Sequence, residues 1–199
     1  IKVTMDMLGE FITTKNLIEK NTDNYLRIIE EMEKSQVDGN YSLKPTMFGL
    51  LIDKDLCYEK VREVVKNASD HNNYVRLDME DSTCTDLEIE LFRKLKSEFP
   101  DNVGIVFQAY LKRTLQDLEN LLDMNSPENP LNIRLCKGIY VEPEKIAYKH
   151  NHTINKHFLE DLEFLFANNV YPAIATHDKA LIRGALKLIK KYNIHPHEY

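Results

Sequence analysis

The segment Val103-Gly-Ile-Val-Phe-Gln-Ala-Tyr110 decides the fold class of this chain. It is rich in β-branched and aromatic residues, so we predict a buried strand, and it carries one polar residue, Gln108, near its end. Leucines at positions 115, 118, 121 and 122 follow at helical spacing, and Thr114 is expected to cap that helix. A buried strand followed by an amphipathic helix is the repeating unit of a parallel sheet.

The same alternation of strand and helix continues on both sides of this segment. Strands are predicted at residues 1–8, 41–45, 74–79, 103–110, 133–136 and 171–175. Helices are predicted at residues 13–35, 55–69, 85–99, 114–122, 151–168 and 179–192. We expect Asp81 or Ser82 to cap the third helix, and His177 or Asp178 the last. Because antiparallel hairpins need no intervening helix, this alternation predicts a parallel sheet.

Polar residues at the strand ends distinguish a β/α barrel from an open doubly wound sheet, both of which are parallel. These residues are Asp6, Lys44, Asp78, Gln108, Arg134 with Lys137, and His177. An open sheet gathers ligand-binding groups at one switch point, whereas every strand of a barrel ends at one mouth. We therefore predict an α/β fold of the (β/α)8 TIM-barrel type, as a single domain over residues 1–199. A closed barrel typically needs about 250 residues, so we expect about the first six β/α units, with the C-terminal part missing.

The composition limits the classes of partner. The chain has 199 residues with 26 Lys and Arg against 32 Asp and Glu, and this net charge of −6 argues against nucleic acid as the main partner. No apolar run reaches membrane-spanning length and the three cysteines are widely spaced, so we expect a cytoplasmic protein in a reducing compartment. The glycines form neither GxGxxG nor GxxxxGK, so a nucleotide would have to bind by another route.

The charges at the strand ends predict an anionic ligand. Four basic residues face two acidic ones there: Lys44, Arg134, Lys137 and His177 against Asp6 and Asp78. Unpaired cations are costly to bury, so this excess favours a carboxylate, a phosphate or an electron-rich cofactor ring. Asp78 could pair with Lys44 or with Arg134 and hold either in position.

Two further residues suit a flat ligand such as a flavin. Gln108 can both donate and accept hydrogen bonds, as the uracil-like edge of a flavin requires. Gly138 would let a flat or phosphorylated ligand approach the backbone closely. We expect no metal site, because the strand ends offer too few carboxylates and imidazoles for a complete set of ligands.

Several segments resemble the proline dehydrogenase family. They are Met-Asp-Met-Leu-Gly-Glu at 5–10, Ser-Leu-Lys-Pro-Thr at 42–46, Arg-Leu-Asp-Met-Glu-Asp-Ser at 76–82, the segment at 103–110, Ile-Arg-Leu-Cys-Lys-Gly-Ile-Tyr at 133–140 and Ala-Thr-His-Asp at 175–178. The resemblance covers essentially the whole chain in the right order. It is closer to the short, single-function enzymes than to the long bifunctional ones (proline utilization A).

The resemblance implies a distorted barrel that binds FAD without a Rossmann domain. It implies oxidation of L-proline to Δ1-pyrroline-5-carboxylate, with a hydride passing to flavin N5 and electrons passing on to a membrane quinone. Contact with a membrane would then be peripheral, at the inner membrane, which is mitochondrial in a eukaryote. By motif, Asp78 and Arg134 are similar to the catalytic pair, and Lys44 and Tyr140 to substrate-binding residues. The positions similar to flavin contacts are Met79, Gln108, Arg134, Cys136, Lys137, Gly138, Ala175, Thr176 and His177.

The family pattern continues beyond residue 199, and two other readings stay open. The resemblance places a pair of arginines that bind the proline carboxylate in a later helix, so we expect weak flavin retention and little proline oxidation from this chain alone. One alternative is a Schiff-base lyase of the aldolase type, with Lys44 or Lys137 forming the imine. The other is a non-catalytic barrel fragment. The sequence leaves the oligomeric state open.

Overall fold

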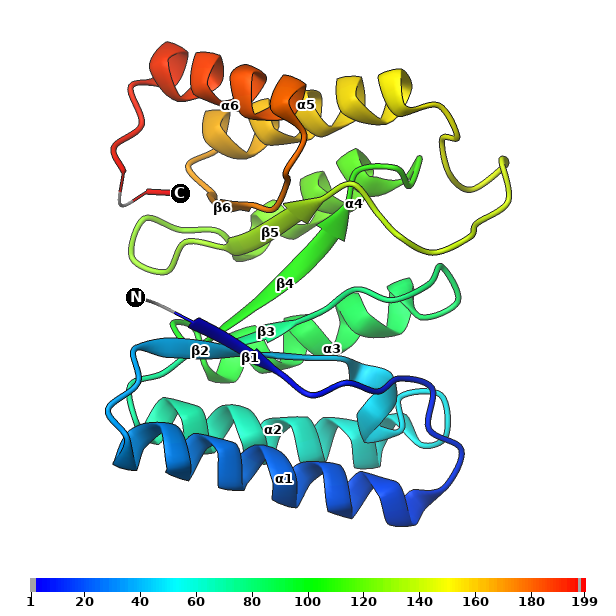
Figure 1. The fold of residues 1–199 in the computed structure, drawn as a ribbon, viewed down its shortest axis with the longest axis vertical. Coiled ribbons are helices and arrows are strands. Elements are labelled where there is room, and N and C mark those ends of the chain that lie inside the picture. The colour runs from blue at the N-terminus through cyan, green and yellow to red at the C-terminus, as the bar shows by residue number, and fades with distance from the viewer. Residues whose placement is uncertain (1–2, 197) are drawn as a thin grey trace. The chain divides into compact units, whose positions relative to one another are not determined.

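The computed structural model describes residues 3–196 and 198–199, and the chain forms two compact units. The first unit is Ile1–Ile105 and the second is Val106–Tyr199. The boundary between them falls inside strand β4 (Val103–Gln108). Strands backed by helices form each unit (Figure 1).

The first unit pairs its strands in the order in which they occur. Its elements are β1 (Val3–Asp6), α1 (Lys15–Lys34), β2 (Gly39–Leu43), the 3₁₀ helix η1 (Pro45–Phe48), α2 (Lys54–Asp70), β3 (Val75–Leu77) and α3 (Thr85–Glu98). β1 pairs with β2, β2 with β3 and β3 with β4, all in parallel. Figure 1 shows α1 and α2 side by side against these strands. Ile18, Tyr25 and Ile29 of α1 recur at helical spacing and are fully buried, which explains why this helix packs as it does.

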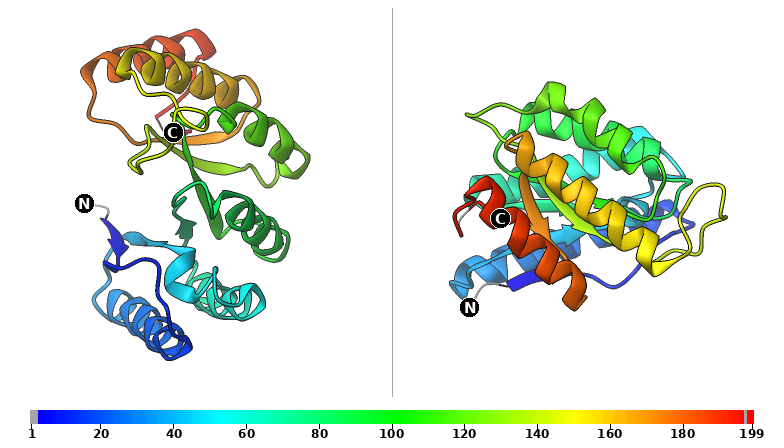
Figure 2. Two further views of the ribbon diagram at one scale, coloured as in Figure 1. Left: turned by 90° about the vertical axis from the view of Figure 1, so that its right-hand side faces the viewer. Right: turned by 90° about the horizontal axis from the view of Figure 1, so that it is seen from above.

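The second unit repeats the same construction. After the end of β4, it contains α4 (Thr114–Leu121), the 3₁₀ helix η2 (Leu122–Met124), β5 (Asn132–Cys136), α5 (Asn151–Ala167), β6 (Tyr171–Ile174) and α6 (Lys179–Tyr192). β5 pairs in parallel with β6, with Arg134 opposite Ala173. The helices α5 and α6 pack side by side, as both views in Figure 2 show.

The strand order confirms the predicted fold class. Strands β1 to β6 follow one another in chain order, and the pairings within the two units are parallel. A doubly wound sheet reverses its strand order at a switch point, whereas sequential order is that of a β/α barrel. The chain therefore has an α/β fold with six β/α units of the barrel type. Within the part of the chain that the structure describes, no helix has the length and apolar character needed to cross a membrane.

The predicted elements are present, and their ends differ for local reasons. The helix predicted at residues 179–192 matches α6, and Asp178 caps it by accepting hydrogen bonds from two backbone N–H groups, as predicted. β2 ends at Leu43 because Pro45, which has no N–H, begins η1. The strand predicted at residues 1–8 is β1, and residues 1–2 of that prediction lie outside the described residues.

Two predicted helix caps are wrong. Arg113 rather than Thr114 precedes α4, and the Thr114 hydroxyl instead donates to the last carbonyl of β4 at 2.6 Å. Cys84 precedes α3, so neither Asp81 nor Ser82 caps it, and Asp81 accepts a backbone hydrogen bond in a local turn at 3.0 Å. In both places the polar side chain stabilises the loop after a strand instead of the helix that follows.

Candidate functional site

In the first unit, residues at the carboxyl ends of three neighbouring strands meet around Lys44. Its Nζ lies 3.5 Å from Asp6 Oδ2 and 3.7 Å from Asp78 Oδ2. We call Asp6, Lys44 and Asp78 the Lys44 cluster. The side chains of Lys44 and Asp78 are each 20% exposed, so the cluster is sheltered but can be reached by a small ligand. Of the two partners expected for Asp78, Lys44 and Arg134, the structure pairs it with Lys44.

The parallel register brings this cluster together. Asp6 ends β1, Lys44 directly follows β2, and Asp78 directly follows β3, so all three lie at the same edge of the sheet. The backbone N–H of Asp78 donates to the Leu43 carbonyl at 2.8 Å. The Ser42 hydroxyl donates to Asp78 Oδ1 at 2.6 Å. Strand β2 thus anchors both the backbone and the carboxylate of Asp78, and Ser42 is a site residue that the sequence did not single out.

Arg76 is a second residue that the sequence analysis missed. It lies in the middle of β3, opposite Ser42 in the register, and is buried. Its guanidinium carbon lies 5.2 Å from the centre of the Tyr74 ring, a distance at which a cation and an aromatic face attract each other. An arginine between two apolar strand residues was the available signal, because arginine is seldom buried without a role.

In the second unit, Lys137 is held by an acid that the prediction had treated only as a helix cap. Lys137 Nζ lies 2.7 Å from Asp178 Oδ2, and Asn155 Nδ2 donates to the same oxygen at 3.0 Å. The ion pair with Lys137, followed by the hydrogen bonds from Asn155 and the first turn of α6, holds the pKa of Asp178 well below its usual range. Asp178 thereby fixes the lysine and begins α6 at the same time.

The expected excess of unpaired basic groups at the strand ends does not include the two lysines. Lys44 lies between two carboxylates, and Lys137 has Asp178 as its partner. The argument for an anionic ligand therefore cannot rest on these two lysines. The sequence could not show the second pairing, because Lys137 and Asp178 are 41 residues apart along the chain.

One face of β5 and β6 is accessible, which is unusual for a parallel sheet. In β5, Ile133 and Leu135 are buried whereas Arg134 and Cys136 are partly exposed. In β6 and the loop after it, residues 173–176 are all partly exposed. Strands of parallel sheets are normally covered on both faces. Arg134 lies opposite Ala173 in the register, so this partly exposed arginine neighbours a small side chain.

Gly138 has a structural role in the turn after β5. Its φ is +112°, and a Cβ at this position would overlap the ring of Tyr110. Tyr110 therefore fills the space on the side where a Cβ would point, and the expected approach of a ligand to this glycine stays a prediction. Only glycine adopts this backbone conformation readily, so the residue fixes the turn after β5.

The other predicted residues lie in varied surroundings. Gln108 is buried, and its Oε1 accepts a hydrogen bond from the Ile139 N–H at 3.4 Å. Met79 is buried directly after Asp78, Tyr140 is partly exposed in the loop after β5, and His177 is exposed. The structure thus groups Lys44, Asp78 and Met79 in the first unit and the remaining predicted residues in the second.

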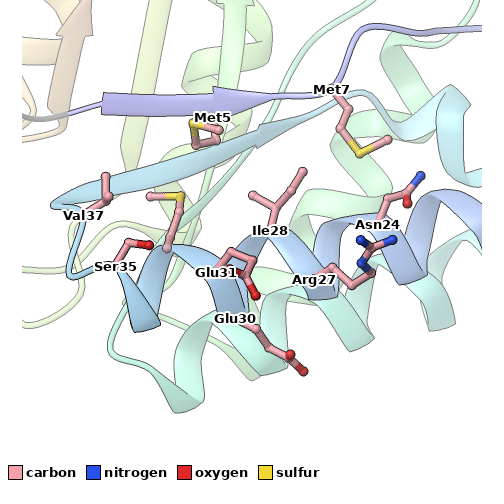
Figure 3. Close-up of a pocket in the computed structure, with 10 residues that line it drawn as sticks. Met5, Met7, Asn24, Arg27, Ile28, Glu30, Glu31, Ser35 and Val37 are labelled. Carbon is pink, nitrogen blue, oxygen red and sulfur yellow. The ribbon is translucent and has the colours of Figure 1, made fainter.

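The described residues also form a groove that is separate from the Lys44 cluster. A groove of about 670 Å³ lies between β1 and α1 and is lined by Met5, Met7, Ile28 and others, but by no residue of the cluster (Figure 3). No group of three or more His, Cys, Asp or Glu side chains in the described residues is arranged to hold a metal ion.

Comparison with known proteins identifies the class to which this fold and cluster belong. The family model described as "Proline dehydrogenase" matches residues 1–199. The chain therefore belongs to the proline dehydrogenase family.

Particular relatives show how much of such a protein the chain represents. It is 32% identical over 194 residues to "Proline dehydrogenase 2" of Bacillus subtilis (strain 168), covering 98% of this chain and 62% of that protein. It is 31% identical over 195 residues to "Proline dehydrogenase" of Deinococcus radiodurans, covering 96% of this chain and 61% of that protein. The chain thus spans about three-fifths of the length of these relatives.

A solved structure supports the fold assignment. Proline utilization A from Bdellovibrio bacteriovorus, inactivated by N-propargylglycine, superposes with a TM-score of 0.88 at 22% identity. The match covers 98% of this chain and 25% of that one. At this level of identity, the similarity establishes the fold.

Proposed function

We propose that this chain carries the substrate and flavin residues of a proline dehydrogenase, which oxidises L-proline to Δ1-pyrroline-5-carboxylate with FAD and passes the electrons to a quinone. One observation carries the proposal: in a member of this family, Lys44 lies between Asp6 and Asp78 at the carboxyl ends of three parallel strands. Active sites of β/α barrels are built at that end of the strands.

The Lys44 cluster has the charges needed to bind an amino acid. Proline carries a carboxylate and a secondary ammonium group, and the cluster offers one ammonium group and two carboxylates. In our proposal, Lys44 attracts the substrate carboxylate and Asp78 accepts a hydrogen bond from the substrate nitrogen. The Ser42 hydroxyl and the backbone of β2 orient Asp78 for this role. Tyr140, in the loop after β5 of the second unit, is the other residue that the family resemblance assigns to substrate binding.

The second unit has residues that fit FAD. The accessible face of β5 and β6 offers Arg134 beside small side chains. The proposed flavin contacts in this unit are Gln108, Arg134, Cys136, Lys137, Gly138, Ala175, Thr176 and His177. When bound, FAD would supply the acceptor for the two electrons that leave the proline ring. Arg134 would stabilise negative charge on that acceptor, and Asp178 would keep Lys137 in position.

The Schiff-base alternative has no observation in its favour. Lys44 and Lys137 both lie in ion pairs with carboxylates, and an ammonium group must lose its proton before it can form an imine. If the chain were such a lyase, borohydride would trap a carbonyl substrate covalently on the lysine. Our proposal predicts no covalent trapping.

A turnover assay with L-proline, FAD and an artificial electron acceptor tests the proposal, on this chain and on a longer natural form. We expect Asp78→Ala and Arg134→Ala to lower turnover by about 100-fold or more, because each removes a charged group from the site. Both variants should fold, as checked by circular dichroism. Lys187→Ala, an exposed change on α6, is the matched control and should leave turnover unchanged. Wild-type turnover in either site variant contradicts the assigned roles, and no turnover in either form favours the non-catalytic alternative.

A further inference from the structure

Glu80 is a buried acid that the proposed chemistry does not use. It follows Asp78 by two residues and has 0% of its surface exposed. Its Oε2 accepts a hydrogen bond from the Thr46 N–H at 2.9 Å, and its Oε1 accepts one from the Thr46 hydroxyl at 2.5 Å. Thr46 in turn follows Lys44 by two residues. A single carboxyl group therefore joins the loop after β2 to the loop after β3.

Two more hydrogen bonds extend this connection. The Phe11 N–H donates to Thr46 Oγ1 at 2.7 Å, which attaches the segment that follows β1. The Glu80 N–H donates to Glu88 Oε1 at 2.9 Å, which attaches α3. Glu88 is also fully buried, and its Oε2 has no hydrogen-bond partner among the described residues. The three loops that present the Lys44 cluster thus converge on the side chains of Thr46 and Glu80.

This arrangement depends on the charge of Glu80. An ionised carboxylate only accepts hydrogen bonds, so it satisfies both Thr46 donors, whereas a protonated one must itself donate from one oxygen. The charges of Glu10 and Lys44 act on it, and its own charge acts on Cys57, Cys84 and Glu88. Burial raises the pKa of Glu80 to about 7, and the two Thr46 hydrogen bonds oppose that rise. Burial also raises the pKa of Glu88 well above its usual range.

We propose that Glu80 is a positioning residue for the Lys44 cluster: its ionised carboxylate holds the loops after β1, β2 and β3 together through Thr46, and uptake of one proton loosens that hold. The consequence for catalysis rests on the function proposed above. The contact between the loops is independent of that function, because it is present in the chain without substrate.

The test is a pH titration of this chain followed by NMR, without substrate or cofactor. We expect the Thr46 and Phe11 amide resonances and the Lys44 side-chain resonances to shift together with one midpoint near pH 7. In Glu80→Gln this shared midpoint should disappear, because the amide side chain does not titrate. In Thr46→Val the midpoint should rise by about one pH unit, because the ionised carboxylate loses one donor. Thr46→Ser keeps the hydroxyl and should restore the wild-type midpoint.

Matched controls separate positioning from general folding effects. Glu59→Gln, an exposed change on α2, should leave the midpoint unchanged. If Glu80→Gln does not fold, the comparison of Thr46→Val with Thr46→Ser still decides the question. The proposal is overturned if the Thr46 and Phe11 amides do not titrate near pH 7, or if Lys44 does not follow them. Failure of the chain to oxidise proline would contradict the proposed function. It would not change the result expected from this titration.

Discussion

At the scale of single residues, the Lys44 cluster depends on contacts that are few and specific. Two carboxylates lie within 3.7 Å of the Lys44 ammonium group, and Ser42 fixes one of them. Sequence reasoning found Lys44 and Asp78, because a charged residue at the end of a buried strand is conspicuous. It missed Ser42 and Arg76, because a side chain inside a strand gains its role only from the neighbouring strand opposite it.

Asp161 gives a prediction at this scale. It lies on α5 and is 2% exposed; its Oδ2 has no hydrogen-bond partner among the described residues, and burial raises its pKa to about 7. The folded state thus holds this proton more tightly than the unfolded state, so the stability it contributes is lost as pH rises from about 4 to about 7. We expect Asp161→Asn to stabilise the protein by about 2 kcal/mol near pH 8.

Urea unfolding at several pH values measures this effect. The difference between Asp161→Asn and the wild type should shrink towards zero or change sign below about pH 4, where Asp161 is protonated in both the folded and the unfolded state. Glu163→Gln on the same helix is a useful contrast, because an ion pair with Lys191 lowers the pKa of that exposed carboxyl. Its effect on stability should have the opposite sign. A pH-independent difference for Asp161→Asn would contradict the account of this residue.

At the scale of helices and strands, the sequence predicts the bounds of an element best where a single capping residue determines where that element begins or ends. Asp178 caps α6 and Asn193 ends it in a left-handed conformation, so the predicted and observed bounds of this helix agree. Thr114 has the same chemical preference for a helix start, yet it bonds to the end of β4 instead. Glu80 looks like part of a solvated acidic run, Asp-Met-Glu-Asp, and its burial follows only from how three loops pack. The roles of Thr114 and Glu80 both depend on contacts with parts of the fold that no local sequence pattern shows.

Two substitutions of Asp178 test whether this side chain both caps α6 and pairs with Lys137. Asp178→Asn keeps an oxygen that can cap α6 but loses the ion pair with Lys137, whereas Asp178→Ala loses both. Thermal unfolding near pH 7 should therefore rank the wild type as the most stable and the alanine variant as the least. Because the ion pair lowers the pKa of Asp178, the gap between wild type and Asp178→Asn should close as pH falls below about 4. Equal stability of the two variants would contradict the capping role.

At the scale of the whole molecule, family and strand order lead to the same proposal from independent evidence. The family model covers all 199 residues, and the strands β1 to β6 follow one another in the order expected of a barrel. The chain spans about three-fifths of the length of its proline dehydrogenase relatives. The sequence alone led to this family through six short motifs, whereas the partners of the charged residues became visible only in three dimensions.

The most direct test of the central claim is anaerobic reduction of bound flavin by L-proline. The chain is first titrated with FAD, and flavin fluorescence reports binding. L-proline is then added without oxygen, with D-proline as the control, and the visible absorbance of the flavin is recorded. We predict that a longer natural form binds FAD and that L-proline alone bleaches it, with Asp78→Ala slowing the bleaching, whereas this chain alone retains FAD weakly and is bleached little. Bound flavin that stays oxidised with L-proline, in this chain and in a longer natural form, would contradict the claim.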